Sequence, residues 1–230
     1  MRMASGWIAV LAALAAAPPA MPQEGTARFA VLPLENTGSY GQDKEVFEAL
    51  ELGLAGMLAR AIDRHPAADV VPRAQLSEAM RALAPGSGQR VDAAGATRIG
   101  KETGARYTVT GSFADFYGKF RINARLVDAR SGEIVKVVSN DDPKLQDRAQ
   151  LAGIIQHVAQ KVTAASGLPP YPSGGAAPSI ATDAITAYSR ALLHESRGDR
   201  AKAADLYQSA LTSAPGFEEA SDGLARVRGR

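Results

Sequence analysis

Apolar residues recur along the chain with two different spacings, and these spacings predict strands and helices in a definite order. Short apolar runs or apolar–polar alternation predict strands over 28–34, 69–71, 106–117, 119–128 and 133–139. Apolar residues three and four positions apart predict helices over 43–64, 73–83, 92–104 and 144–166. We therefore expect an α/β fold, in which a mixed sheet with antiparallel hairpins packs against helices.

Single residues mark where several of these helices begin or end. Asp43 and Asp92 are positioned to cap the helices that follow them. Asp142 precedes Pro143, an order typical of a helix start. Gly104 stands where a helix would end in a left-handed residue. The boundaries of the predicted helices rest on these residues.

Three glycines carry further information about packing and turns. Gly53 and Gly56 lie inside the helix predicted over 43–64, where glycine weakens a helix relative to alanine. A close approach of the helix backbone to the sheet would explain them. Gly118 separates the two longest predicted strands, which indicates a tight hairpin.

The last third of the chain has a different character from the α/β part, which we place at 24–166. Proline, glycine and serine dominate 167–180, which predicts a linker with an extended proline half and a flexible glycine half. Helical periodicity then returns in three segments, 183–197, 201–213 and 217–227. We expect residues 181–230 to form a small all-α tail, a helical hairpin with one extra helix.

The first residues predict export. Arg2 is followed by an apolar run over 7–17 and then by small residues and prolines, as in a secretory signal peptide over 1–22. We place the mature N-terminus between Pro18 and Glu24. An uncleaved membrane anchor is the alternative, although the run is shorter than the about 20 apolar residues that span a bilayer. A signal peptide would place the protein in the periplasm.

Composition narrows the classes of function. The sequence has no cysteine, which excludes a disulfide and the lipid anchor of a bacterial lipoprotein. The net charge is +2 and aromatic residues make up 6% of the chain, a composition that argues against a nucleic-acid partner. No segment after the first residues is long and apolar enough to predict a membrane span.

The sequence offers little for catalysis. Its three histidines lack the spacing of metal ligands, and Gly86-Ser87-Gly88 lacks the lysine and hydroxyl residue of a phosphate loop. No Gly-x-Ser-x-Gly nucleophile motif is present. We therefore predict no catalytic residue, cofactor or metal ion, and keep an uncharacterised enzyme only as a third hypothesis.

Two features of the predicted hairpin are candidates for binding. Phe116 and Tyr117 flank the turn, where aromatic side chains are often exposed and favour interfaces. The alternative is that one ring folds back onto the core. Arg121 and Arg125 share the polar face of the second strand and could bind an anion, unless that face is only solvated.

The α/β part resembles the family of the curli secretion component CsgG and the TolB amino-terminal domain. The resemblance rests on Phe29–Asn36 (FAVLPLEN), Gly104–Phe113 (GARYTVTGSF) and Ile122–Val135 (INARLVDARSGEIV), and it covers Phe29 to Val162. It implies an envelope protein that assembles or secretes surface structures. At face value it also implies a subunit of an outer-membrane secretion channel, the second hypothesis, although we expect that this chain does not itself form a pore.

The tail resembles a tetratricopeptide unit. The matching residues fill its small, turn, aromatic and terminator positions: Ala191, Gly198, Asp199, Ala203, Tyr207, Ala210 and Pro215. A lone repeat cannot bury its hydrophobic face, so it must pack on helix 217–227, on the α/β part or on another chain. The resemblance makes Tyr188, His194 and Tyr207 candidates for protein contacts.

The favoured expectation is a non-enzymatic periplasmic accessory or scaffold protein. Its partners would be other envelope proteins, with self-association left open, and a partner could bring it to the outer membrane. Neither nucleic acid nor a cofactor is expected. We also expect the tail to be tethered by the linker, so that deletion of 181–230 would remove a partner and leave the α/β part folded.

Overall fold

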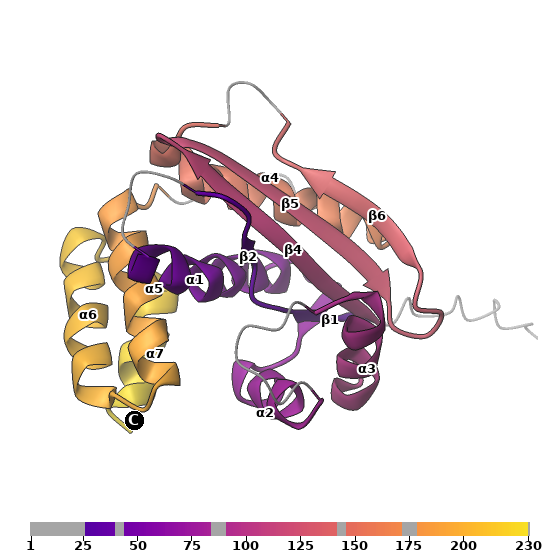
Figure 1. Ribbon diagram of the computed structural model, residues 1–230, viewed down its shortest axis with the longest axis horizontal. Coiled ribbons are helices and arrows are strands. Elements are labelled where there is room, and N and C mark those ends of the chain that lie inside the picture. The colour runs from indigo at the N-terminus through magenta and orange to yellow at the C-terminus, as the bar shows by residue number, and fades with distance from the viewer. Residues whose placement is uncertain (1–25, 40–43, 84–90, 142–145, 172–178, 230) are drawn as a thin grey trace, which may run out of the picture.

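The computed structural model is a mixed α/β structure (Figure 1), as the hydrophobic pattern predicts. It describes residues 26–39, 44–83, 91–141, 146–171 and 179–229. The predicted signal peptide over 1–22 and the predicted cap Asp43 lie outside the described residues.

One sheet organises the α/β part, in the strand order β3-β1-β4-β5-β6. The strands of this path are β1 (Ala27–Val31), β3 (Ala68–Val70), β4 (Tyr107–Phe116), β5 (Lys119–Asp128) and β6 (Ile134–Ser139). Strand β1 is parallel to both β3 and β4, whereas β4, β5 and β6 are antiparallel neighbours. The short strand β2 (Glu35–Asn36) pairs with β4, so the strand predicted over 28–34 ends earlier and a second one follows it.

Helices cover the two faces of the sheet unequally. Helices α1 (Lys44–Asp63) and α4 (Leu151–Ala165) pack together on one face, and α4 contacts β5 and β6. Helices α2 (Arg73–Leu83) and α3 (Ala93–Thr103) pack together beside β1, and α3 also contacts β4 and β5. In Figure 1, α4 lies behind β5 and β6, and no described helix lies in front of β4–β6 toward the β4–β5 turn.

The predicted ends of α3 are confirmed. The Asp92 carboxylate accepts a hydrogen bond from the Gly95 N–H group at 2.7 Å, which satisfies a free donor of the first turn. Gly104 ends the helix with φ of 68°. This left-handed conformation is one that glycine adopts without a steric penalty.

The helix predicted over 144–166 begins later than expected. Asp147 caps a short 3₁₀ turn over 148–150, and α4 starts only at Leu151. The reason is competition from the sheet, because Gln146 accepts a hydrogen bond from the Phe120 N–H group at 2.6 Å and Asp147 bridges to Lys119. Backbone groups that pair with a strand cannot join the first turn of a helix. Asp142 and Pro143 lie outside the described residues.

The tail consists of α5 (Thr182–Ser196), α6 (Arg200–Ser213) and α7 (Glu218–Val227), close to the three predicted segments. Helix α5 packs directly against α1. A Cβ atom on Gly53 would lie 2.6 Å from the Ser189 Cβ, and one on Gly56 would lie 2.5 Å from the Tyr188 hydroxyl. The two glycines therefore permit close approach of α1 to α5, not to the sheet as the sequence suggested.

The start of the predicted linker is attached to α1. The His65 ring accepts a hydrogen bond from the Ala67 N–H group at Nδ1, so its Nε2 donates to the Pro169 carbonyl at 2.9 Å. The Tyr171 hydroxyl donates to the Ala61 carbonyl at 2.8 Å. The glycine half of the linker lies outside the described residues, and the segment boundaries stay a prediction.

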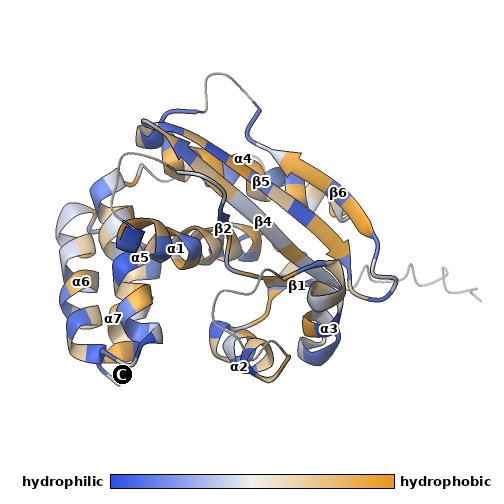
Figure 2. Ribbon diagram, viewed as in Figure 1, coloured by the Kyte–Doolittle hydropathy of each residue, from blue (hydrophilic) through white to orange (hydrophobic). Residues whose placement is uncertain are grey.

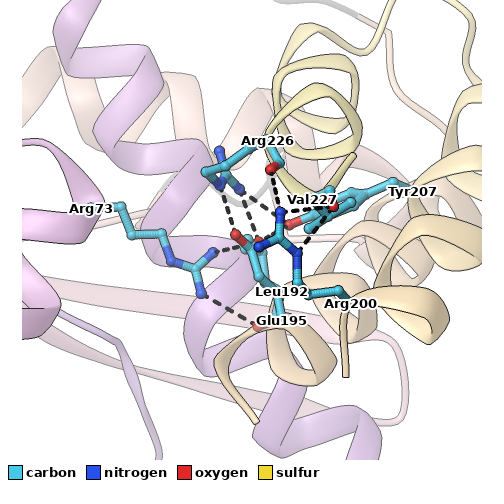
Figure 3. A network of polar contacts seen from close by, with 7 residues as sticks. All are labelled: Arg73, Leu192, Glu195, Arg200, Tyr207, Arg226 and Val227. Carbon is cyan, nitrogen blue, oxygen red and sulfur yellow. Dashed lines mark hydrogen bonds and ion pairs between the residues drawn. The ribbon is translucent and has the colours of Figure 1, made fainter. Parts of the chain in front are cut away.

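A polar network ties the tail to α2 (Figure 3). Glu195 of α5 accepts hydrogen bonds from Arg226 of α7 at 2.7 Å and from the Tyr207 hydroxyl of α6 at 2.6 Å. Arg73 of α2 donates to the Leu192 carbonyl at 3.3 Å and lies 3.9 Å from the Glu195 carboxylate. One carboxylate thus connects α2 with all three helices of the tail.

This network predicts a specific loss of stability in acid. Burial by itself raises the pKa of Glu195, but the hydrogen bonds from Arg226 and Tyr207 outweigh it and lower the pKa overall. A carboxyl group with a lowered folded pKa stabilises the fold above its unfolded pKa, and this contribution disappears as the pH falls through the folded value. We therefore expect Glu195→Gln to destabilise the protein near neutral pH. The difference from the wild type should shrink below 4.5, the ordinary value for the group.

Urea unfolding of both proteins, measured between about pH 7 and about pH 3, tests this expectation. Glu102→Gln is the matched control, because Glu102 is exposed on α3 and its removal should change nothing. A constant difference between Glu195→Gln and the wild type across the whole range would contradict the role assigned to the Glu195 charge.

Candidate functional site

The part of the sheet near the β4–β5 turn presents a distinctive surface, which we call the hairpin face. Along β5, Phe120, Ile122, Ala124 and Leu126 are buried, and the residues that alternate with them point to the opposite side. The hairpin face consists of exposed side chains on that opposite side and at the turn: Phe116, Tyr117, Lys119, Arg121, Arg125 and Val137.

The turn at the tip of this face has an unusual backbone. Strand β4 ends at Phe116 and β5 begins at Lys119, so only Tyr117 and Gly118 connect them. Both have positive φ, 51° and 87°, and Tyr117 is the one non-glycine residue with positive φ in the part of the chain that the structure describes. Glycine or asparagine usually occupies such positions. A bulky residue there is strained at a cost of about 1–3 kcal/mol, which points to a function for this side chain.

A buried ion pair supports the turn from below. Asp115 is completely buried, its carboxylate accepts a hydrogen bond from the Gly118 N–H group at 2.9 Å, and the Arg148 guanidinium binds its other oxygen. The Arg148 N–H group also donates to the Gly118 carbonyl at 2.8 Å. The base of the hairpin is therefore held by contacts from both β4 and the segment that leads into α4.

Neither aromatic ring at the tip folds back onto the core. Phe116 is 49% exposed and Tyr117 is 84% exposed. Among the described residues, the other exposed large hydrophobic side chains all belong to β6: Ile134, Val135 and Val137. Exposed apolar residues therefore gather on one hairpin and one edge strand, a distribution typical of interaction surfaces.

The cations of the hairpin face have no acidic partner within the described parts of the chain. No ion pair or hydrogen bond joins the side chains of Lys119, Arg121 or Arg125 to another described residue. By contrast, Arg106 pairs with Asp128 at 3.0 Å at the far end of the same strands. The spacing of residues along a strand separates the two arginine Cα atoms of β5 by about 13 Å. The face thus offers several positive charges beside aromatic and aliphatic surface.

The tail residues that the sequence proposed for binding lie elsewhere. Tyr188 is 4% exposed and Tyr207 is completely buried, so their rings are part of the core and not of an open groove. The physical reason is that α7 and the residue before it close over them. The Phe217 ring lies 4.9 Å from the Tyr188 ring, measured between centroids, and a Cβ atom on Gly223 of α7 would meet the Tyr207 ring. His194 is half-buried between Glu45 of α1, at 3.8 Å, and Asp199, at 3.5 Å. These three residues are not brought together with the hairpin face.

The structure also contains a cavity that sequence reasoning did not find. It has a volume of about 350 Å³ and lies between β2, α1, α2 and β4, with the residues that follow β1 as part of its wall. Glu51 lines it and accepts a hydrogen bond from the Asn36 N–H group at 3.2 Å, and burial raises the pKa of its carboxyl group. Its walls are mostly aliphatic, including Leu52 and Met80. Because its lining comes from four separate elements, no local motif in the sequence could predict it.

Metal-binding clusters and membrane-spanning helices are both absent from the described residues. No cluster of three or more histidine or carboxylate side chains there could hold a metal ion. No helix among them combines the length and the hydrophobicity needed to cross a membrane.

The chain matches no protein-family model and no curated protein. It is similar to the solved C-terminal domain of LpoB from Salmonella enterica, with 19% identity, 50% of this chain and 82% of that chain covered, and a TM-score of 0.39. LpoB from Escherichia coli is 18% identical, with 60% of this chain and 78% of that chain covered and a TM-score of 0.40. TolB from Acinetobacter baumannii is 15% identical, with 62% of this chain and 27% of that chain covered and a TM-score of 0.36. Likenesses at these TM-scores assign neither a family nor a function. The CsgG and tetratricopeptide resemblances stay predictions.

Proposed function

We propose that this chain is a non-enzymatic accessory protein of the bacterial cell envelope that binds an anionic protein partner through the hairpin face. The observation that carries the proposal is the strained, 84% exposed Tyr117 at the tip of a hairpin whose base is fixed by a buried ion pair. Residues that retain strain and exposure together are typical of ligand contacts. The signal-like first residues support an envelope location.

The chemistry of the face indicates the kind of partner. Tyrosine and arginine contribute most of the binding energy in many interfaces, because they bury large surfaces and make directional hydrogen bonds. Arg121 and Arg125 can each bind a carboxylate with two parallel hydrogen bonds. Their positive potential also accelerates encounter with an acidic surface, most strongly at low salt. An acidic surface with an apolar pocket for the tyrosine ring would therefore complement the hairpin face.

The alternative of a secretion-channel subunit gains no support from the described residues. Strands β5 and β6 contact α4 with one face, and β4 contributes Val109 and Phe113 to the same core. These strands are therefore committed to packing inside the α/β part, and an interaction surface on the other face is the simpler function.

Charge reversal tests the proposal directly. We expect Arg121→Glu/Arg125→Glu to reduce binding to envelope proteins at least about tenfold, because loss of two favourable charge contacts exceeds the 1.4 kcal/mol that a tenfold change requires. Binding is measured by quantitative affinity capture from a solubilised envelope fraction at two salt concentrations. The control Arg98→Glu/Lys202→Glu makes the same change in charge at exposed positions of α3 and α6. Equal capture by both double variants would contradict the proposal.

A second arm of this experiment uses the strain at the turn. Tyr117→Gly should raise stability by about 1 kcal/mol, because glycine adopts positive φ without a steric penalty. The same variant should capture less partner, because the aromatic anchor is gone. A gain in stability together with a loss of binding is the outcome that a purely structural tyrosine would not produce. Unchanged capture would show that Tyr117 makes no contact with the partner.

A further inference from the structure

Strand β6 forms an edge of the sheet and is unusually apolar for that position. It has six residues, and Ile134, Val135 and Val137 are 50%, 42% and 55% exposed. Figure 2 shows it as a largely hydrophobic ribbon at the outer edge. At the opposite edge, β3 has only three residues, and Pro72 follows soon after it. Among the described residues, no strand pairs with the outer side of β6.

Edge strands are normally protected against pairing with other chains, by charges, prolines, bulges or short length. Strand β6 has two such devices, Lys136 and an irregular register opposite Leu126 and Val127. Beyond that irregularity the register with β5 is regular from Lys136 to Ser139. Half of the backbone N–H and C=O groups of this stretch point away from β5, because donors and acceptors alternate between the two sides of a strand. At the end of the stretch, the Ser139 carbonyl accepts a hydrogen bond from the Lys161 ammonium group at 2.9 Å.

We infer that β6 binds an extended acidic segment of the protein partner, which adds to the sheet as a further strand. The inference rests on the proposed function and specifies the partner chemically. In strand addition, backbone hydrogen bonds supply affinity and alternate side chains supply specificity. Val137 lies on the hairpin face next to Arg125, and Lys136 points to the other side of the sheet. The bound segment should therefore carry an apolar residue beside Val137 and an acidic residue beside Lys136.

Charge favours a different protein over a second copy of this chain. Strand β6 contains one lysine and no carboxylate, and its neighbour β5 presents Lys119, Arg121 and Arg125. Pairing two copies edge to edge would place two β6 strands side by side, each with a lysine and no carboxylate to offset it, and like charges directly opposite each other are destabilising. An acidic residue of a bound segment neutralises Lys136 on the side of the sheet opposite the hairpin face, while the alternate residues of the segment lie beside Val137.

Selection from a library of random octapeptides displayed on phage tests the inference with the full chain as the target. Enriched peptides should alternate apolar residues with Asp or Glu. With Lys136→Glu as the target, the preferred charged residues should change to Lys or Arg, whereas Lys202→Glu should keep the original preference. Selection without an alternating pattern, or an unchanged preference with Lys136→Glu, would overturn the inference.

The strongest peptide then separates strand addition from side-chain docking. Its analogue with alternate N-methylated amides keeps every side chain but loses donors along one edge, and it should bind at least about tenfold more weakly. Hydrogen exchange of the amides over 136–139 should slow on binding of the unmodified peptide. Equal binding of the N-methylated analogue would overturn the inference, as would slow exchange in the free chain that depends on protein concentration, since this would indicate a second copy on β6.

Failure of this inference can be distinguished from failure of the proposed function. If no octapeptide is enriched while capture of envelope protein still depends on Arg121 and Arg125, the hairpin face binds a partner and β6 does not. If octapeptides pair with β6 while capture is insensitive to the two arginines, strand addition stands and the role of the hairpin face is wrong.

Discussion

Deletion of residues 181–230 is expected to abolish cooperative folding, in contrast to the independent α/β part that the sequence suggested. Leu192, Ile185 and Tyr188 of α5 are buried in one continuous cluster with Leu54 and Met57 of α1. Each large apolar side chain contributes about 1.5–3 kcal/mol when it is fully buried. The free energy lost by removing several of them, and by exposing the side of α1 that they cover, is close to the whole net stability of about 5–15 kcal/mol.

Urea unfolding followed by circular dichroism, with the truncated and full chains compared, measures this effect. A cooperative transition in the truncated chain, with a midpoint close to that of the full chain, would restore the interpretation of the tail as a tethered module. The buried side of α1 is the physical basis of the expectation, because an exposed apolar stripe of that size favours aggregation or unfolding.

A substitution at Gly53 tests the same contact in the full-length chain. In an isolated helix, Gly→Ala would stabilise by up to about 1 kcal/mol, but here the new Cβ would meet the Ser189 side chain at 1.8 Å and the Ser189 Cα at 3.0 Å. We expect Gly53→Ala to destabilise by about 1–3 kcal/mol. Addition of Ser189→Gly should recover part of the loss. Gly216→Ala is the control, because no atom lies within 4 Å of the added Cβ.

Arg148→Ala is expected to cost about 3–5 kcal/mol, because it leaves the carboxylate of Asp115 buried without its cation. Asp115 is completely buried and Arg148 is mostly so, with side-chain exposures of 0% and 22%. At about 2–4 °C per kcal/mol for a chain of this length, the melting temperature should fall by roughly 10 °C. Differential scanning calorimetry measures the change.

The double variant Asp115→Leu/Arg148→Leu separates the two contributions of the ion pair. Replacing both partners with apolar groups removes the unpaired charge, so this variant should be more stable than Arg148→Ala. It still loses the hydrogen bond from the Gly118 N–H group to Asp115, so the hairpin turn should loosen and partner capture should fall. A cost below about 1 kcal/mol for Arg148→Ala would show that water already reaches this carboxylate.

Local sequence patterns were sufficient to predict most of the helices and strands. Period and capping residues located α2 at 73–83 and both ends of α3, because a helix start or end depends on neighbours within one turn. The alternation of apolar and polar residues along β5 predicted which side of the hairpin is exposed to solvent, and it placed Arg121 and Arg125 on that side. The exposure of Phe116 and Tyr117 was one of two open alternatives at the sequence level, since local patterns do not show whether an aromatic ring reaches the core.

Features that depend on contacts between distant segments could not be predicted from the sequence. Gly53 packs against Ser189, and Asp115 pairs with Arg148, which lies 33 positions further along the chain. In both pairs, the residues around one partner do not predict the other. For the same reason, the sequence made Tyr188 and Tyr207 candidates for protein contacts, although α1 and α7 bury them. The exposed edge of β6 also follows from the strand order alone, because an apolar strand of its composition could equally lie at the centre of a sheet. Periodicity shows which residues share a face of one helix or strand, whereas the tertiary structure decides which other element, if any, packs against that face.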